Sequence, residues 1–303
     1  MTRLRLRCPA KVNLHLEVLG KRPDGYHEVR TLLAAVGLFD ELELALAPEG
    51  SVELTVESGF SLPLEGNTIL KAARRLAETT GTKAGAHIRL SKRIPVAAGL
   101  GGGSSNAAAA LVGLSQLWGL PVRWETLFSL AAGIGADVPF FLLGGVCWGV
   151  GRGDEVYPLP DLPESWVVLV PGREPVLTAT VYGALSFGPE RRFPNPTVYN
   201  WVLQGGSLPV GALVNDLQKA ATDLFPWVEE ALERMRRCQP ELALVSGSGG
   251  TVFGLFPSVQ GARGAAEILQ DLGALAVPIL SRRQSSLGYF ASGGAYGDNR
   301  SAS

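Results

Sequence analysis

The chain has few of the residues that form disulfides or bind zinc. It has three cysteines and three histidines among 303 residues. Cys8, Cys147 and Cys238 lie far apart, which fits neither a disulfide framework nor a CxxC zinc site. No two histidines have the spacing of an HExxH zinc motif. This scarcity excludes a disulfide scaffold and predicts a reducing, cytoplasmic setting.

Charge of one sign and long apolar runs are also absent. The formal net charge is −1, so no global field attracts nucleic acid. The most apolar segment, residues 136–150, is shorter than the roughly 18 residues that a membrane helix needs. The first residues lack the continuous apolar stretch of a signal peptide. With 46% hydrophobic and 18% charged residues, the composition indicates a compact soluble protein without nucleic-acid or membrane partners.

Hydrophobic periodicity predicts an α+β fold. Alternation from Cys8 to Val18 predicts a half-buried strand, with Lys11 and Asn13 on its polar face. Asn67 and Gly81 have the positions of helix caps around an apolar stripe. Strands cluster early in the chain, and helices surround the glycine-rich segment that follows them.

A proline- and glycine-rich stretch marks a domain boundary near residues 155–165, after which a new strand begins. We therefore expect an N-terminal domain over residues 1–160 and a C-terminal domain over residues 161–290. The small polar tail, residues 291–303, is predicted to be disordered. The chain is expected to be a monomer or a weak homodimer.

The segment "IPVAAGLGGGSSNAAAALVGL", residues 94–114, combines a glycine-rich loop with good helix material. The first N–H groups of a helix lack internal partners and attract anions, and missing side chains let phosphate oxygens approach. No lysine follows the loop as in a Walker A motif, and the GxGxxG fingerprint is incomplete. A tight helix-entry loop with a serine cap is the alternative. Phosphate binding is favoured, because four glycines are more than a cap requires.

This segment resembles the phosphate-binding motif of the GHMP kinases, the galactose, homoserine, mevalonate and phosphomevalonate kinases. Residues 9–29, "PAKVNLHLEVLGKRPDGYHEV", resemble the first motif of that family, and residues 245–256, "VSGSGGTVFGLF", resemble its third. The match extends over about residues 8–256. It implies a two-domain GHMP kinase fold with the active site in the cleft between the domains, and ATP with Mg²⁺ as cofactors. The residues expected to bind ATP are Pro95, Val96, Ala97, Ala98, Gly99, Leu100, Gly101, Gly102, Gly103, Ser104, Ser105 and Asn67.

The resemblance also implies the catalytic residues. Lys11 in "PAK" corresponds to the family's lysine beside the reacting hydroxyl, although period-two alternation alone would favour a solvated strand face. Asp137 in "GADVPFF" corresponds to the general base, although an aspartate there could simply cap a helix. Ser105 is the suggested side-chain ligand of magnesium. Asn67 is expected to border the adenine pocket, but its capping role explains it as well.

The acceptor is expected to carry a cytidine diphosphate. The "PDGYHE" stretch resembles GHMP kinases with such a substrate, which implies that Tyr26 and His27 hold the cytosine by stacking and edge hydrogen bonds. As ordinary hairpin residues, one would pack and the other would face solvent. Asn13 and Thr178 resemble substrate contacts, and Thr178 could instead cap the following helix.

Two alternatives and one departure remain at this stage. Another small-molecule GHMP kinase, of the homoserine or mevalonate type, would share the loop but should lack "PDGYHE". A nucleotide-binding regulatory protein could keep the fold and lose the chemistry, but Lys11 and Asp137 are both present. The family commonly continues "NDL" with glutamate, whereas this chain has Gln218, which weakens any acidic function there.

Overall fold

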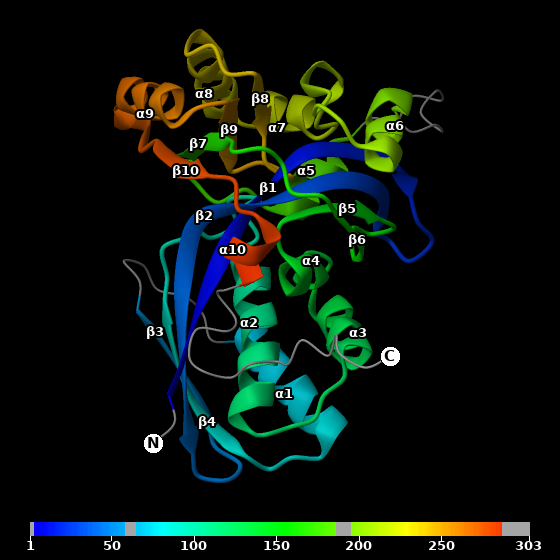
Figure 1. The fold of residues 1–303 in the computed structure, drawn as a ribbon, viewed down its shortest axis with the longest axis vertical. Helices are drawn as coiled ribbons and strands as arrows, with labels where there is room; N and C mark the ends of the chain where they lie inside the picture. Colours follow the sequence, from blue (N-terminus) through cyan, green and yellow to red (C-terminus); the bar gives the residue numbers. More distant parts are fainter. Residues whose placement is uncertain (1–2, 58–64, 186–194, 287–303) are drawn as a thin grey trace, which may run out of the picture.

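The computed structural model describes residues 3–57, 65–185 and 195–286, and the predicted tail lies outside them. These residues form a mixed α+β structure with two sheets, one in each half of the molecule (Figure 1). The α+β fold class is confirmed. None of the helices in the described ranges is long and apolar enough to cross a bilayer.

The N-terminal sheet is built around a long hairpin. Its strands are β1 (Arg3–Lys21), β2 (His27–Ala47), β3 (Val52–Glu57), β4 (Gly85–Ser91), β5 (Val146–Val150) and β6 (Glu155–Leu159). They follow the order β3-β4-β2-β5-β6, with β1 paired to β2. The helices of this half are α1 (Thr68–Thr80), α2 (Gly102–Leu117), α3 (Trp124–Ile134) and α4 (Val138–Leu143). As expected, Asn67 caps α1 by accepting from the Ile69 N–H, and Gly81 ends it with φ 71°.

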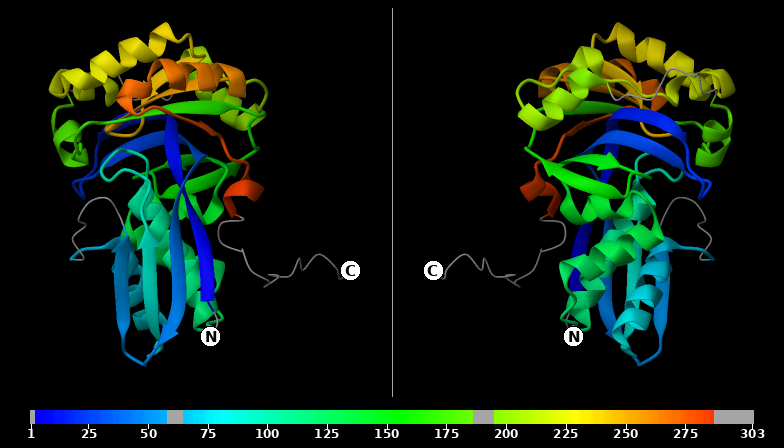
Figure 2. Two further views of the ribbon diagram at one scale, coloured as in Figure 1. Left: turned by 90° about the vertical axis from the view of Figure 1, so that its left-hand side faces the viewer. Right: turned by 90° about the vertical axis from the view of Figure 1, so that its right-hand side faces the viewer.

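The second sheet has the order β10-β7-β9-β8. Its strands are β7 (Trp166–Pro171), β8 (Leu242–Val245), β9 (Thr251–Phe256) and β10 (Leu275–Pro278). The helices of this half are α5 (Thr178–Gly183), α6 (Pro196–Gln204), α7 (Gln218–Leu224), α8 (Pro226–Arg237) and α9 (Val259–Ile268), with short 3₁₀ turns at Val210–Ala212 and Gln270–Leu272. Helices α8 and α9 cover the outer face of this sheet, and the β1–β2 hairpin extends beneath its inner side (Figure 2).

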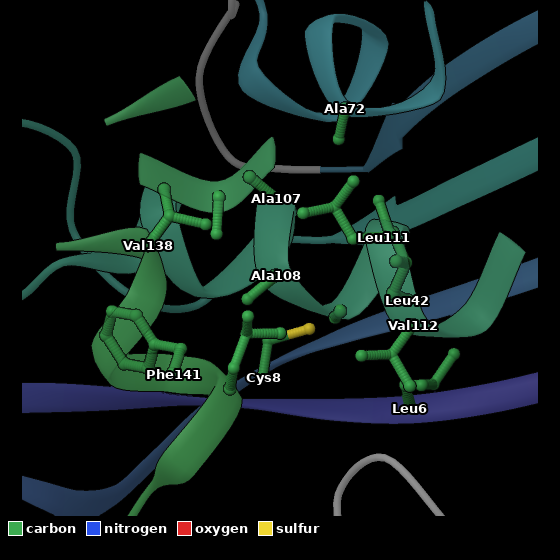
Figure 3. Close-up of a cluster of buried hydrophobic side chains, with 14 of the residues drawn as sticks. Leu6, Cys8, Leu42, Ala72, Ala107, Ala108, Leu111, Val112, Val138 and Phe141 are labelled. Atoms are coloured by element: carbon green, nitrogen blue, oxygen red, sulfur yellow. The ribbon is translucent and has the colours of Figure 1, made fainter. Parts of the chain in front are cut away.

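Helix α2 lies at the centre of the N-terminal half. Twelve of its sixteen residues are buried, since it packs between the sheet, α1 and α4. Figure 3 shows Ala107, Ala108 and Leu111 of α2 among side chains from these three neighbours. Small side chains permit this close packing: a Cβ on Gly113 would meet Leu44 at 2.5 Å. The alanine-rich run is therefore a rigid support for the glycine loop at its N-terminal end.

Strand β1 differs from the half-buried strand that its alternation predicts. Lys11, Asn13 and His15 are at most 4% exposed, so its polar face is buried as well. One face of the hairpin meets α2, and the other meets the second half of the molecule. The alternation of apolar and polar residues predicts which face of a strand is apolar. It does not predict whether residues far along the chain also bury the polar face.

The last described residues, 279–286, return to the N-terminal sheet. After β10, the Leu280 N–H donates to the Ala35 carbonyl at 2.8 Å, and α10 (Arg282–Ser286) lies beside α4 (Figure 1). The proposed domain boundary falls between β6 and β7, which belong to different sheets. Residues 279–286 nevertheless pack on the first half.

Candidate active site

A cleft of about 1030 Å³ runs between the two halves and contains most of the predicted site residues. It is lined by the β1–β2 hairpin, the glycine loop, and the N-terminal ends of α1, α4 and α5. The predicted site residues that line it are Lys11, Asn13, Tyr26, His27, Asn67, Pro95, Val96, Ala97, Ala98, Gly99, Gly101, Gly102, Gly103, Ser104, Asp137 and Thr178. Leu100 and Ser105 are 1% and 0% exposed and do not line the cleft.

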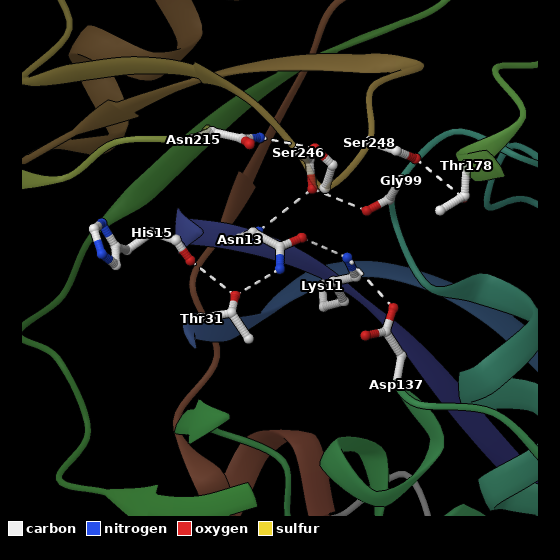
Figure 4. Close-up of polar contacts among 11 residues, drawn as sticks. Lys11, Asn13, His15, Thr31, Gly99, Asp137, Thr178, Asn215, Ser246 and Ser248 are labelled. Carbon is white, nitrogen blue, oxygen red and sulfur yellow. Dashed lines mark hydrogen bonds and ion pairs between the residues drawn. The ribbon is translucent and has the colours of Figure 1, made fainter. Parts of the chain in front are cut away.

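Lys11 lies at the centre of a polar chain that fixes its orientation (Figure 4). Its Nζ donates to Asn13 Oδ1 at 2.6 Å and lies 3.5 Å from Asp137 Oδ2. Asn13 Nδ2 donates to Thr31 Oγ1 at 2.8 Å, and that hydroxyl donates to the His15 carbonyl at 2.8 Å. Because the Thr31 proton is already donated, its oxygen must accept from Asn13. The amide oxygen of Asn13 therefore faces Lys11.

Asp137 directly precedes α4, and its side chain does not cap that helix. Its side chain makes no hydrogen bond to the α4 backbone and is 36% exposed. The carboxylate is turned toward Lys11 instead, so a capping role does not explain this residue. A carboxylate with a buried cation beside it and an open side toward a cleft can accept a proton from a bound hydroxyl.

The glycine loop supplies the anion-binding end of the cleft. Gly101 has φ 69° at the start of α2, and the first N–H groups of that helix lack intrahelical partners. A Cβ on Gly101 would meet Lys11 Cγ at 2.9 Å and Phe141 at 2.8 Å. Within the first turn, Ser104 lines the cleft. Ser105 is buried beneath it, and its Oγ makes no hydrogen bond with other described residues.

The C-terminal glycine motif interlocks with this loop. A Cβ on Gly99 would meet the Ser246 carbonyl oxygen at 2.1 Å, and one on Gly250 would meet Ala98 Cα at 2.7 Å. Ser246 Oγ donates to the Gly99 carbonyl at 2.9 Å. Several glycines of both motifs are therefore needed because the two backbones lie in contact, in addition to any that a bound ligand needs. The two motifs form one unit across the cleft.

The far end of the cleft is aromatic. The His27 ring lies 4.6 Å from the Tyr182 ring, with 30° between their planes, and the Arg152 guanidinium lies 5.0 Å from the Tyr26 ring centre. Burial, and then the charge of Lys21, lower the pKa of His27. Burial thus favours the neutral imidazole over the charged one. The structure pairs His27 with Tyr182, and places Tyr26 separately under Arg152.

Thr178 is the first residue of α5, and Leu177 before it has the N-cap position. The Thr178 hydroxyl lies 3.1 Å from the Ser248 hydroxyl of the C-terminal glycine motif (Figure 4). The Thr178 side chain therefore does not cap α5. Its place in the cleft wall agrees with a substrate contact.

Comparisons with known proteins agree with this arrangement. The models "GHMP kinases N terminal domain" and "GHMP kinases C terminal" match residues 67–145 and 205–276. A 4-diphosphocytidyl-2-C-methyl-D-erythritol kinase of Paramagnetospirillum magneticum is 43% identical over 267 residues, 88% of this chain and 93% of that protein. The one from Geobacter sp. strain M21 is 40% identical over 281 residues, 92% and 99% of the two chains. The chain belongs to the GHMP kinases, among the 4-diphosphocytidyl-2-C-methyl-D-erythritol kinases.

Solved GHMP kinase structures agree. A crystal structure of 4-(cytidine 5'-diphospho)-2C-methyl-D-erythritol kinase superposes with a TM-score of 0.75 at 38% identity, over 91% of this chain and 99% of that one. A homoserine kinase from Cytophaga hutchinsonii superposes with a TM-score of 0.69 at 22% identity, over 94% and 96%. This second likeness shows the shared GHMP kinase fold alone.

The sequence did not identify Tyr182, nor the contacts that Asn215 and Gln218 make in this GHMP kinase. Tyr182 lies four residues after Thr178, and that spacing on one helix face could have indicated it. Asn215, in "NDL", donates to the Val245 carbonyl at 2.7 Å and the Gly247 carbonyl at 2.8 Å, which holds the C-terminal glycine motif. Gln218 accepts from the Val245 N–H at 3.2 Å, a bond that needs only a side-chain oxygen and no negative charge.

A buried ion pair anchors the chain as it enters the loop. Lys92 Nζ lies 2.6 Å from Asp40 Oδ2, and both side chains are at most 4% exposed. Asp40 Oδ1 also accepts from the N–H groups of Arg93 and Ile94, at 2.7 and 2.8 Å. Asn106 of α2 donates to Asp40 Oδ2 at 3.0 Å. One carboxylate thus ties the end of β4 to the first turns of α2, and a full set of partners makes its burial tolerable.

Proposed function

We propose that this protein transfers the γ-phosphoryl group of ATP to the 2-hydroxyl of 4-diphosphocytidyl-2-C-methyl-D-erythritol, a step in non-mevalonate isoprenoid precursor biosynthesis. The observation that carries this proposal is the placement of the Lys11–Asp137 pair. It lies between the glycine loop, which Lys11 contacts at Gly101, and the aromatic end of the same cleft. A phosphoryl donor at one end and a cytidine at the other would meet at this pair.

Each member of the pair has a distinct role in the proposed transfer. Asp137 accepts the proton of the 2-hydroxyl while the oxygen of that hydroxyl forms a bond to the γ-phosphorus. The bond between that phosphorus and the oxygen bridging to the β-phosphate breaks, and ADP leaves. Lys11 orients the carboxylate and the hydroxyl, and it offsets the charge that develops. Because the transition state is loose, positioning and electrostatics contribute more than base strength.

In this proposal the first turn of α2 would hold the phosphates of ATP, and Asn67 at the start of α1 would border its adenine; both segments line the cleft. No group of three or more acidic, histidine or cysteine side chains that could hold a metal occurs in the described ranges. Mg²⁺ nevertheless fits, since it keeps waters and phosphate oxygens as most of its ligands. When bound, it would neutralise charge on the β- and γ-phosphates. Ser104 is better placed than Ser105 to contribute an oxygen, because it lines the cleft.

The aromatic end would bind the cytosine. The His27 imidazole can hydrogen-bond to the edge of the base, while Tyr26 and Tyr182 offer flat faces. Asn13 and Thr178 line the cleft, where the erythritol can contact them. This arrangement favours a cytidine-linked acceptor over a small free alcohol such as homoserine or mevalonate.

The test is a phosphorylation assay with ATP and magnesium that offers 4-diphosphocytidyl-2-C-methyl-D-erythritol beside homoserine and mevalonate. We expect only the cytidyl substrate to be phosphorylated. Asp137→Asn should lower kcat about 10²–10⁴-fold while ATP binding survives. Asp223→Asn, at an exposed carboxylate on α7, is the matched control and should keep full activity. Use of homoserine or mevalonate instead would leave the kinase assignment and overturn the acceptor. Bound ATP without any transfer would favour a regulatory protein.

The remaining proposals concern organisation. A domain boundary near residue 160, a cytoplasmic location, and a monomer or weak homodimer are still predictions. Sedimentation velocity over a range of concentrations would test the oligomeric state.

A further inference from the structure

The return of the chain to α4 places a short C-terminal turn behind the proposed catalytic base. Residues 279–286 leave the second sheet at β10, and the Ile279 N–H donates to the Ser165 carbonyl at 2.9 Å. Leu280 is 6% exposed and joins the hydrophobic cluster that contains Phe140 and Phe141 of α4. Figure 1 shows α10 between the second sheet and α4.

Ser285 makes a polar contact with the residues that directly follow α4. Its Oγ accepts from the Gly145 N–H at 2.7 Å, just beyond the C-terminal end of α4. The same hydroxyl lies 3.0 Å from the Ser281 carbonyl oxygen, to which it donates. Ser285 is 1% exposed, so water does not replace these partners. A Cβ on Gly144 would meet Ser285 Oγ at 2.3 Å, so the surfaces are in direct contact.

Arg282 fixes the turn from its other side. Its Nη2 donates to the Leu159 carbonyl at 2.9 Å and to the Val146 carbonyl at 3.1 Å, which joins the ends of β5 and β6. Its N–H donates to Asp161 Oδ1 at 2.8 Å. The turn is thus held to the sheet, and α4 is held to the turn.

Helix α4 links this contact to the reacting centre. It has only six residues, with Asp137 at its N-terminal end and Gly144 at its C-terminal end. No side-chain hydrogen bond holds its N-terminus. Phe141, in its middle, lies against Gly101 of the glycine loop. A shift at the C-terminal end would therefore move Asp137 relative to Lys11 and the phosphates.

From these contacts we infer that Ser285 is a positioning residue for phosphoryl transfer, which acts through α4 on Asp137. The inference rests on the proposed function and adds to it a residue outside the cleft. Because misplacing a reacting group by about 1 Å can lower a rate about 10²-fold, a partial loosening of α4 is expected to lower kcat about tenfold. The KM values for ATP and acceptor should change less than about threefold, since the residues that bind both remain in place.

A double-mutant cycle separates this role from a merely structural one. Ser285→Ala, Asp137→Asn and the double variant are assayed with ATP and 4-diphosphocytidyl-2-C-methyl-D-erythritol, and ATP binding is titrated to count folded sites. Ser285→Ala should lower kcat about tenfold per site in the wild-type background and less than about twofold beside Asp137→Asn, because coupled sites are not additive. Ser286→Ala is the matched control: that hydroxyl donates only to the Arg283 carbonyl within the turn, at 3.2 Å, and full kcat is expected.

The outcomes are distinct. If Ser285→Ala lowers kcat equally in both backgrounds, or lowers only the number of sites that bind ATP, the positioning role is refuted. Should Ser285→Ala fold poorly, Ser285→Cys keeps a weaker acceptor of similar shape and should give an intermediate kcat with the same coupling. If the wild-type protein binds ATP and does not phosphorylate the acceptor, the proposed function fails, and this inference fails with it.

Discussion

Replacing Lys11 by methionine tests the electrostatic centre of the site. At the observed 3.5 Å from Asp137, two unit charges interact by about 5 kcal/mol at an effective dielectric constant of about 20. Asp137 is 36% exposed, so solvent reduces this to about 2–3 kcal/mol. A similar attraction between Lys11 and the charge that develops on the transferred phosphoryl group corresponds to about 30–150-fold in rate. Lys11 also orients the hydroxyl, so we expect kcat to fall about 10²–10³-fold.

Methionine is chosen because it keeps the length of the buried side chain and removes only its charge. Lys11 is 3% exposed, so a shorter residue would also leave a cavity. ATP binding should stay within about threefold of wild type, because the backbone N–H groups at the start of α2 remain in place. The assay is steady-state kinetics with the cytidyl acceptor, together with a nucleotide-binding titration and a melting curve.

Lys71→Met, at an exposed position on α1, is the matched control and should leave kcat unchanged. A kcat of Lys11→Met within threefold of the wild-type value, with ATP binding intact, would refute the electrostatic role of Lys11. A loss of ATP binding equal to the loss of activity would instead assign Lys11 to the nucleotide site.

Three further predictions follow from contacts and burial. Gly99→Ala should lower kcat/KM for ATP at least about tenfold, because the new Cβ would meet the Ser246 carbonyl oxygen at 2.1 Å. Gly119→Ala is the control for backbone strain in the same kinetic assay, because Gly119 has a similar φ and a Cβ there would meet no atom within 4 Å. Tyr182→Ala should raise the acceptor KM about tenfold and leave the KM for ATP unchanged, whereas Tyr182→Phe should keep both, as initial rates will test. Burial raises the pKa of Cys8 and Cys147 to about 12, so on the order of 10⁻⁴ of each thiol is ionised at pH 8. Neither should react with a disulfide reagent at pH 8 until denaturant is added. Cys238 is partly exposed, so rapid reaction of more than one thiol per native chain would contradict this burial.

The glycine loop could be predicted from the sequence because its composition is a local requirement. A run of residues without side chains is costly in entropy, so it implies close approach of backbone to something else. The sequence indicated phosphate as that partner, and the start of α2 at Gly102 agrees with it. It did not indicate the second partner. Gly99 and Gly250 also exclude side chains because the two glycine motifs lie against each other.

The burial of β1 could not be predicted, because it depends on contacts between residues far apart in the chain. Alternation along β1 assigns Lys11 to a polar face, and on an isolated sheet that face would meet water. Here that face is covered by the start of α2, by Asp137 before α4 and by the tip of the C-terminal glycine motif. A Cβ on Gly101 would lie 2.9 Å from Lys11 Cγ, and one on Gly247 would lie 3.4 Å from Lys11 Nζ. The same reasoning applies to Tyr182, whose contact with His27 joins elements more than 150 residues apart.

The covering of β1 has a chemical consequence. A lysine on an open strand face would be hydrated and free to rotate, and its attraction to Asp137 would be weak. Burial of Lys11 against the C-terminal glycine motif removes that water, while Asn13 and Asp137 supply the partners that a buried ammonium needs. Gly247 makes this possible, because its absent Cβ would lie 3.4 Å from Lys11 Nζ and 3.2 Å from Asn13 Oδ1. The second half of the chain thus strengthens the charge that the first half places beside the reacting hydroxyl.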